Sequence, residues 1–250
     1  EIIWYLESLH LCTRDQIYLD EIILDVIIRN KIQTFCNQRI LGVPFQYILK
    51  KSNFYGRDFY INQHTLIPRP ETELFIDNLK DLFFNTALEI GTGSGVLAIT
   101  LSLEKIINKI LATDISTSAL SVANKNIEYF KLSNILLQQH DFLHQNFNTK
   151  FDLILSNPPY ISYSEYQQLS PGIKDYEPEI ALTDKKDGLS FYLRFAEILP
   201  DILKSDGTFL CEMGSASSAP LIKKIFIDGG YTIQIHKDLN LDERILQINL

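Results

Sequence analysis

The stretch Thr86–Lys105, TALEIGTGSGVLAITLSLEK, decides the fold of this chain of 250 residues. A short apolar segment leads into the glycine-rich loop Gly91–Gly95, and an apolar run of helical length follows it. Glycine allows a sharp turn from strand to helix and a close approach of a ligand to the backbone. The free N–H groups at the start of the helix would point at that ligand. The stretch therefore predicts a strand, a ligand-binding loop and a helix in succession.

The same alternation of apolar strands and helices continues to the end of the chain. Further strands are predicted in residues 109–114, 134–141, 151–160, 207–214, 231–238 and 244–250, and helices in residues 118–130, 188–203 and 218–230. Strands that alternate with helices form a mostly parallel sheet covered on both faces. No helix separates the last two strands, so we expect them to form an antiparallel pair. The predicted fold class is α/β, with a Rossmann-like sheet.

The first 50 residues have the periodicity of helices. Apolar residues recur three and four positions apart at Ile22, Ile23, Val26 and Ile27. Thr13 is a candidate helix N-cap with Gln16 at the third helical position. Gly42 and Pro44 end the helical pattern. An amphipathic bundle packed on itself is the simplest interpretation of this region.

Residues 51–70 differ from both neighbours, because aromatic and polar residues alternate around a glycine. We predict a β-hairpin that pairs Phe54-Tyr55 with Phe59-Tyr60-Ile61 and turns at Gly56-Arg57-Asp58. Two prolines in IPRPE then hold the chain extended, and helical periodicity resumes from Glu71 to Phe84. The expected organisation is an N-terminal helical domain (1–50), a hairpin linker (51–70) and an α/β domain (71–250).

Composition narrows the class of protein. A net charge of −8 with 46% hydrophobic residues suits a folded domain and argues against nonspecific wrapping of nucleic acid. No stretch approaches the roughly 18 uninterrupted apolar residues of a membrane span. Cys12, Cys36 and Cys211 are far apart, so we expect free thiols in a reducing, cytoplasmic compartment. His140 and His144 are four positions apart, but they flank a strand end and not a helix face, so no metal site is predicted.

Acidic and aromatic residues at the ends of the next two strands suggest the ligand. The glycines follow G-x-G-x-G rather than the dinucleotide spacing, which favours another adenosine-containing ligand over a nicotinamide cofactor. Asp114, about 20 residues after the loop, can accept both hydroxyls of a ribose. Asp141 and Phe142 can meet the amino group and the face of adenine. The alternatives are a helix N-cap for Asp114 and a place in the core for Phe142.

The strand at 151–156 ends abruptly in Asn157-Pro158-Pro159-Tyr160. The prolines remove two backbone donors, while their carbonyls remain as acceptors. Asn157 adds an acceptor and Tyr160 a flat face, so together they suit a planar –NH₂ group held in line for a displacement. The tetrapeptide alone is also compatible with a proline-rich turn capped by asparagine. Even as a binding motif, it leaves adenine N6 and glutamine N5 open.

These motifs in this order resemble the class I methyltransferases that use S-adenosylmethionine. The resemblance implies that Gly91, Thr92, Gly93, Ser94 and Gly95 lie by the methionine part of the cofactor, and that Glu89 orients its amino group. It further implies that Asp114 holds the ribose, that Asp141 and Phe142 hold adenine, and that Asn157 borders the cofactor.

From about residue 40 onward the chain also resembles the PrmC/HemK family of peptide chain release factor glutamine N5-methyltransferases. The most specific segment is IPRPETE (67–73), and YEPEIAL (176–182), DGLSFY (187–192) and KDLNLDERIL (237–246) are similar to later blocks of the family. One departure is Phe142, where tryptophan is common.

This second resemblance implies a substrate, namely the glutamine of the Gly-Gly-Gln motif in class-1 release factors. Asn157 and the Pro158 carbonyl would hold its amide, and Pro159 and Tyr160 would shape the slot. The N-terminal helices would contact another part of the release factor. The alternatives are an adenine N6-methyltransferase acting on DNA or RNA, and a protein that binds a release factor or the ribosome without catalysis.

Overall fold

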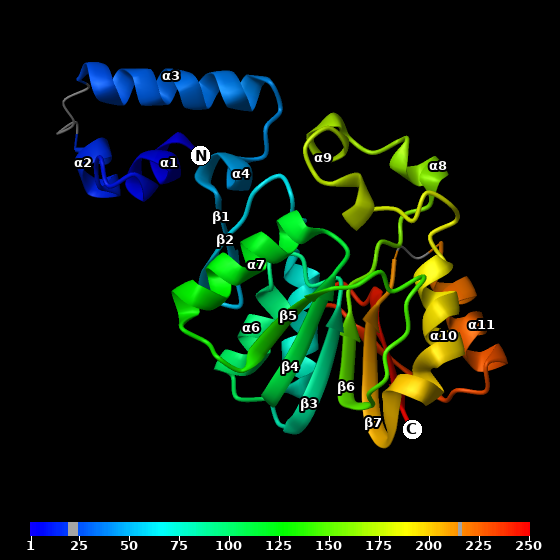
Figure 1. The fold of residues 1–250 in the computed structure, drawn as a ribbon. Helices are drawn as coiled ribbons and strands as arrows, with labels where there is room; N and C mark the ends of the chain where they lie inside the picture. The colour runs from blue at the N-terminus through cyan, green and yellow to red at the C-terminus, as the bar shows by residue number, and fades with distance from the viewer. Residues whose placement is uncertain (20–24, 215–216) are drawn as a thin grey trace.

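A seven-stranded sheet forms the centre of the computed structural model, which describes residues 1–19, 25–214 and 217–250 (Figure 1). The strand order is β5-β4-β3-β6-β7-β9-β8. The strands are β3 (Phe84–Ile90), β4 (Ile107–Asp114), β5 (Ile135–Gln139), β6 (Phe151–Ser156), β7 (Leu203–Glu212), β8 (Ile233–Lys237) and β9 (Glu243–Asn249). The five strands β3 to β7 are parallel, and β9 is antiparallel to both β7 and β8. The predicted sheet with its antiparallel closing pair is confirmed.

Helices cover both faces of this sheet (Figure 1). They are α5 (Leu74–Leu79), α6 (Val96–Leu103) and α7 (Thr117–Phe130) on one face, and α10 (Ser190–Ile202) and α11 (Ala219–Asp228) on the other. Strand β6 shows how the faces divide. Leu153 and Leu155 join the core cluster that contains α5 and α6, whereas Ile154 joins the one under α10 and α11. Because side chains alternate along a strand, a central strand buried on both faces must be apolar on both faces, as Leu153-Ile154-Leu155 is.

The hairpin consists of β1 (Lys51–Phe54) and β2 (Arg57–Tyr60). The predicted hairpin is present, but its predicted turn and pairing are wrong, because Phe59 pairs with Ser52 and not with Phe54. Tyr55 and Gly56 form the turn with positive φ values of 48° and 73°, so Arg57 pairs with Phe54. A two-residue turn with two positive φ angles matches the twist of the paired strands. Asn126 of α7 anchors the hairpin, since its side chain bonds the backbone N–H and carbonyl of Tyr60 at 2.8 and 2.9 Å.

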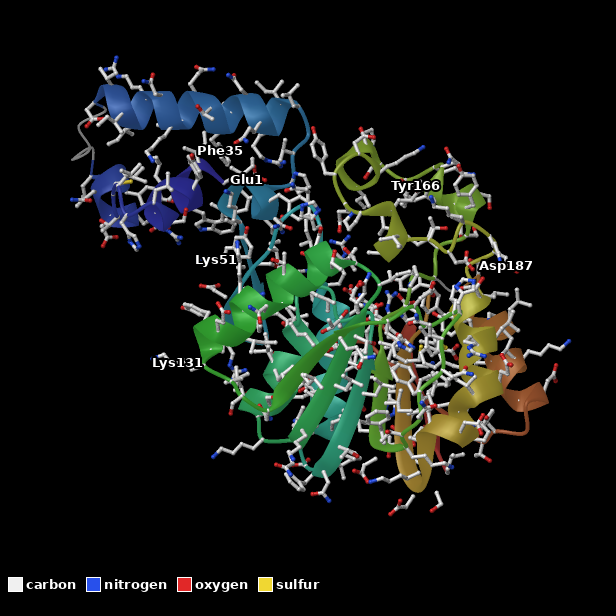
Figure 2. The ribbon with its side chains drawn as sticks, viewed as in Figure 1. Glu1, Phe35, Lys51, Lys131, Tyr166 and Asp187 are labelled. Atoms are coloured by element: carbon white, nitrogen blue, oxygen red, sulfur yellow. The ribbon has the colours of Figure 1, made fainter. Side chains whose placement is uncertain are left out.

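Four helices precede the hairpin: α1 (Ile2–Ser8), α2 (Arg14–Tyr18), α3 (Val26–Ile40) and α4 (Phe45–Leu49). The Thr13 cap is confirmed, because its side chain accepts a bond from the Gln16 N–H and its own N–H bonds the Gln16 side chain. Phe35 points from α3 toward α1 (Figure 2), where its ring stacks on that of Tyr5 with 4.6 Å between the ring centroids.

The predicted apolar stripe of this region is only partly observed. Ile22 and Ile23 lie outside the described residues. The prediction is wrong for Val26 and Ile27, which are exposed in the first turn of α3, where Ile28 is the buried residue.

Further boundaries differ from the sequence expectation, since β6 ends at Ser156 and not at residue 160, and β7 begins at Leu203 and not at residue 207. The helix expected from Glu71 to Phe84 is a 3₁₀ turn, η1 (Pro70–Glu73), followed by the short α5, and Phe84 already belongs to β3. Between β6 and α10 the chain makes an insertion with three short elements, α8 (Tyr163–Tyr166), α9 (Pro171–Lys174) and η2 (Glu179–Ala181), at the same end of the sheet as the glycine loop (Figure 1). Within the described ranges, no helix has the length and apolar character needed to cross a membrane.

Candidate functional site

A cavity of about 250 Å³ lies at the carboxyl ends of the parallel strands. Open α/β sheets bind their ligands at this edge. Most of the predicted site residues line it: Glu89, Gly91, Thr92, Gly93, Ser94, Asp114, Asp141, Phe142, Asn157, Pro158 and Pro159. Gly95 and Tyr160 are absent from the described lining, although each directly adjoins it in sequence. Residues from four different strand ends therefore meet at one place.

The glycine loop needs its glycines for two different reasons. Gly91, Gly93 and Gly95 have φ values of 76°, 57° and 83°, which side chains rarely tolerate. A Cβ atom at Gly93 would meet no described atom within 4 Å, so the loop presents open backbone there. A Cβ atom at Gly95 would instead lie 3.3 Å from that of Ala123 in α7. Gly95 therefore permits close helix packing and does not face the cavity.

Asp114 fixes the loop to the end of β4. Its Oδ2 accepts a bond from the Gly93 N–H and its Oδ1 accepts one from the Ser116 N–H, both at 2.9 Å. Ser116, and not Asp114, is the N-cap of α7. Burial raises the pKa of the Asp114 carboxyl. A carboxylate that lines a cavity while bonded on both oxygens is held in one orientation.

Glu89 is almost completely buried, yet it lines the cavity. Its Oε2 accepts bonds from the Thr92 hydroxyl at 2.8 Å and the Ala98 N–H at 3.2 Å. Burial raises the pKa of this carboxyl to about 8. Among the described residues nothing donates to Oε1, so this oxygen is available to a cationic group in the cavity.

Phe142 belongs to the core and to the cavity at once. Its ring contacts Phe195 at 4.4 Å and stacks on Phe191 at 5.8 Å between centroids, and only 4% of the residue is exposed. Next to it, Asp141 pairs with His144 at 2.9 Å. A rigid aromatic face and a neighbouring carboxylate are suited to a flat heterocycle with an amino group.

Asn157 lies directly after β6, and its side chain is held from behind. Its Nδ2 donates to Thr72 Oγ1 at 3.1 Å, and the Thr72 hydroxyl donates to Glu212 Oε2 at 2.7 Å. Pro158 and Pro159 follow it along the cavity wall. The Tyr160 ring packs against Gly214, since a Cβ atom at Gly214 would lie 3.0 Å from the ring. Burial raises the pKa of the Tyr160 phenol, so the group stays neutral.

Comparison with known proteins gives the family. The model of the methyltransferase small domain matches residues 70–169. The release factor glutamine methyltransferase of Bacillus subtilis is 40% identical over 218 residues, which cover 82% of this chain and 75% of that protein. The chain belongs to the release factor glutamine methyltransferase family. The release factor glutamine methyltransferase of Enterococcus faecalis is 34% identical over 221 residues, and the match covers 79% of its length. A bifunctional methyltransferase of Rickettsia bellii is 35% identical, with 45% of its length covered.

Solved structures agree on the fold of this family member. The methyltransferase from Pyrococcus furiosus superimposes with a TM-score of 0.61 at 22% identity, over 86% of this chain and 98% of that one. The catalytic domain of hMettl16 gives a TM-score of 0.59 at 18% identity, over 75% and 72% of the two chains. As a class I methyltransferase, the protein uses S-adenosyl-L-methionine as its methyl donor.

The cavity fits this cofactor in its donors and acceptors. The cofactor carries an ammonium group, a carboxylate, two ribose hydroxyls and an adenine. The unpaired Glu89 Oε1 suits the ammonium, and the open backbone at Gly93 suits close approach of the methionine part. Acidic and aromatic side chains at the ends of β4 and β5 suit the nucleoside.

Sequence reasoning missed several lining residues of this methyltransferase. His140 was considered only as a metal ligand, but it is buried at the cavity, and its Nε2 has no partner among the described residues. Thr72 and Arg69 also line the cavity, although IPRPETE entered the prediction only as a family marker. Arg69 pairs at 2.6 Å with Glu177 of the insertion, which also accepts the Ile67 N–H. The available signal was the IPRPETE segment itself, because its residues are specific to the family and had no assigned role in the site.

Proposed function

We propose that the protein transfers the methyl group of S-adenosylmethionine to the side-chain amide nitrogen of the glutamine in the Gly-Gly-Gln motif of class-1 release factors. The observation that carries this proposal is the orientation of Asn157. Its Nδ2 is engaged by Thr72, so its Oδ1 is left as an acceptor, and Pro158, whose carbonyl is a further acceptor, lines the same cavity. Two acceptors in one cavity match the two N–H bonds of a primary amide.

The cofactor assignments follow the strand ends. Gly91 to Ser94 contact the methionine part, with Gly95 shaping the loop from behind, and Glu89 binds the ammonium group. Asp114 accepts the ribose hydroxyls. Asp141 accepts the adenine amino group and Phe142 covers the base, while Asn157 lies between cofactor and substrate. Their shared cavity supports these roles.

The chemistry requires positioning more than a strong base. When bound, the cofactor supplies an electrophilic methyl group on a sulfonium. The nitrogen lone pair forms the new N–C bond as the C–S bond breaks, and one N–H proton then leaves to solvent. An amide lone pair is delocalised, so Asn157 Oδ1 and the Pro158 carbonyl must stabilise the positive charge that develops on nitrogen. Pro159 and Tyr160 hold the slot around the flat amide.

The N-terminal helices, residues 1–50, are proposed to recognise a second part of the release factor, joined by the linker 51–70 to the methyltransferase domain 71–250. Val26, Ile27, Ile40 and Leu41 are exposed apolar side chains of this region. A protein substrate offers surface for such contacts, whereas a nucleic acid would favour basic residues.

Substitution of Asn157 tests the proposed reaction. Asn157→Ala removes the acceptor, so we expect kcat for release factor methylation to fall by about 100-fold or more, with an unchanged Kd for the cofactor. Isothermal titration calorimetry measures the binding and mass spectrometry of the Gly-Gly-Gln peptide measures the transfer. Equal loss of binding and transfer would contradict the assigned role of Asn157.

A further inference from the structure

A chain of hydrogen bonds runs from the site into the interior of the protein. It joins Asn157, Thr72 and Glu212 at 3.1 and 2.7 Å. The three residues come from the end of β6, from η1 and from the last position of β7. Ser156 pairs with Cys211 across the sheet, so Asn157 and Glu212 follow neighbouring positions on adjacent strands. Thr72 is 4% exposed and Glu212 is 3% exposed, so their side chains are largely shielded from bulk solvent.

The order of donors and acceptors in this chain is forced. An ionised carboxylate only accepts hydrogen bonds, so the single hydroxyl proton of Thr72 goes to Glu212. The Thr72 oxygen can then only accept from Asn157. The two ends of an asparagine amide have nearly the same shape, and hydrogen-bond partners alone decide which end points where. Asn157 must therefore turn its –NH₂ to Thr72 and its oxygen to the cavity.

We propose that Thr72 and Glu212 are positioning residues that hold the Asn157 oxygen toward the substrate nitrogen. This inference rests on the proposed function, because it requires a substrate –NH₂ group. A flipped asparagine would present its own –NH₂ to that of the substrate, donor against donor. The flip would remove one of the two acceptors and misplace the nucleophile.

Burial of the Glu212 carboxyl costs free energy, and the positioning role gives a reason for this placement. Burying a carboxyl group disfavours its charged form. Arg69 and Arg244 lie near enough to favour the charge, but their guanidinium groups pair with Glu177 and with Asp238 and Asp242. Among the described residues, Thr72 is the only partner that hydrogen-bonds the Glu212 carboxyl.

The protonation state of Glu212 controls the direction of the chain. Burial and the nearby Glu71 of η1 raise its pKa to about 7, against Thr72 and the two arginines of the linker and β9. Tyr192 of α10 donates to its backbone carbonyl, and Tyr160 and Cys211 pack close by. A protonated Glu212 can donate to Thr72, which frees the Thr72 proton for Asn157 Oδ1. Correct orientation is thus present above about pH 7 and is lost as pH falls below it.

The matched pair Thr72→Val and Thr72→Ser tests the proposal. Valine keeps the shape and removes the hydroxyl, whereas serine keeps the hydroxyl. We expect kcat of Thr72→Val to fall at least about 10-fold below that of Thr72→Ser, while the Kd for the cofactor stays within twofold in both. Values of kcat within twofold of each other would overturn the proposal.

A pH profile supplies a second, independent readout. The kcat of the wild type should rise through about pH 7, and Glu212→Gln should remove this acid limb because glutamine does not titrate. Glu177→Gln is the control, since Glu177 is also buried against the linker but does not bond Thr72, and it should keep the limb. An acid limb retained in Glu212→Gln would overturn the proposal even if Thr72→Val failed to fold.

The same assays separate this inference from the proposed function. The identity of the labelled acceptor with the wild type, release factor or nucleic acid, tests the function. The ratio of Thr72→Val to Thr72→Ser on that same acceptor tests the positioning role, because adenine also presents an –NH₂ group.

Discussion

Glu89 combines burial with access to the cavity, and this gives its carboxyl a measurable signature. Its pKa of about 8 means that most of the group is protonated at pH 7 in the empty protein. A bound ammonium group favours the ionised form. Cofactor binding should therefore release protons at pH 7 and none above about pH 9. Calorimetry in buffers of different ionisation enthalpy measures this release.

Glu89→Gln is the control for that measurement, because it keeps the shape and cannot titrate. It should reduce the buffer dependence at pH 7. A binding enthalpy independent of the buffer in the wild type, or an equal dependence in Glu89→Gln, would show that the ammonium group binds elsewhere.

Asp114 leads to a second prediction at the residue scale. Asp114→Asn replaces one acceptor by a donor that would face the Gly93 N–H, the Ser116 N–H or the ribose. Hydrogen bonds to charged groups contribute about 1.5–3 kcal/mol, so cofactor binding should weaken by about 10- to 100-fold. Asp152→Asn is the matched control, since Asp152 bonds Thr86 at the other end of the sheet. Equal effects of the two substitutions on Kd would contradict a ribose contact.

Cavity-lining residues could be found from the sequence where one segment contains its own signal. Gly91–Gly95 and Asn157–Tyr160 each break a strand with unusual residues, and the topology of a parallel sheet then brings them to one edge. Thr72 and Glu212 could not be found this way, because their contact joins residues 140 positions apart. Nothing in the local sequence of either residue indicates its partner.

At the scale of elements, the loop before α10 supports the tetrapeptide after β6. Gly188 has a φ of 80°, and a Cβ atom there would lie 2.2 Å from the Tyr160 carbonyl oxygen. Gly188→Ala must therefore displace backbone beside the slot. We expect a loss of transfer together with a lower midpoint of urea denaturation.

Gly230→Ala is the control for that substitution. Gly230 has a similar φ of 84°, but its Cβ atom would meet no described atom within 4 Å. It should lose only the roughly 1 kcal/mol of a strained backbone and keep full activity. Equal destabilisation of the two variants with full activity in both would show that Gly188 does not position Tyr160.

The long elements of the α/β fold were predictable, and the short helices between β6 and α10 were not. The periodicities of α6, α7 and α10 extend over two or more turns, and β6 has a continuous apolar run at 153–155. In contrast, α8 and α9 have four residues each, which is too short for a period. Tertiary contacts hold this insertion, such as the bonds of Glu177 to Arg69 and the bridge between Ile161 and Thr183.

At the scale of the whole molecule, the exposed apolar residues of the N-terminal helices should contact the release factor. Ile40→Asp changes a side chain that is 82% exposed, so folding should be unaffected. We expect KM for the release factor to rise several-fold with unchanged kcat and cofactor Kd. Leu239→Asp, at a fully exposed position between β8 and β9, is the control. Equal KM values in both variants would contradict a substrate contact at Ile40.

The most direct test of the central claim is the transfer of labelled methyl from S-adenosylmethionine in a mixture of purified class-1 release factor and nucleic acid. We expect label on the release factor, at the glutamine of Gly-Gly-Gln, and its loss when that glutamine is replaced by alanine. Label in the nucleic acid, or undiminished label on the glutamine-to-alanine factor, would contradict it.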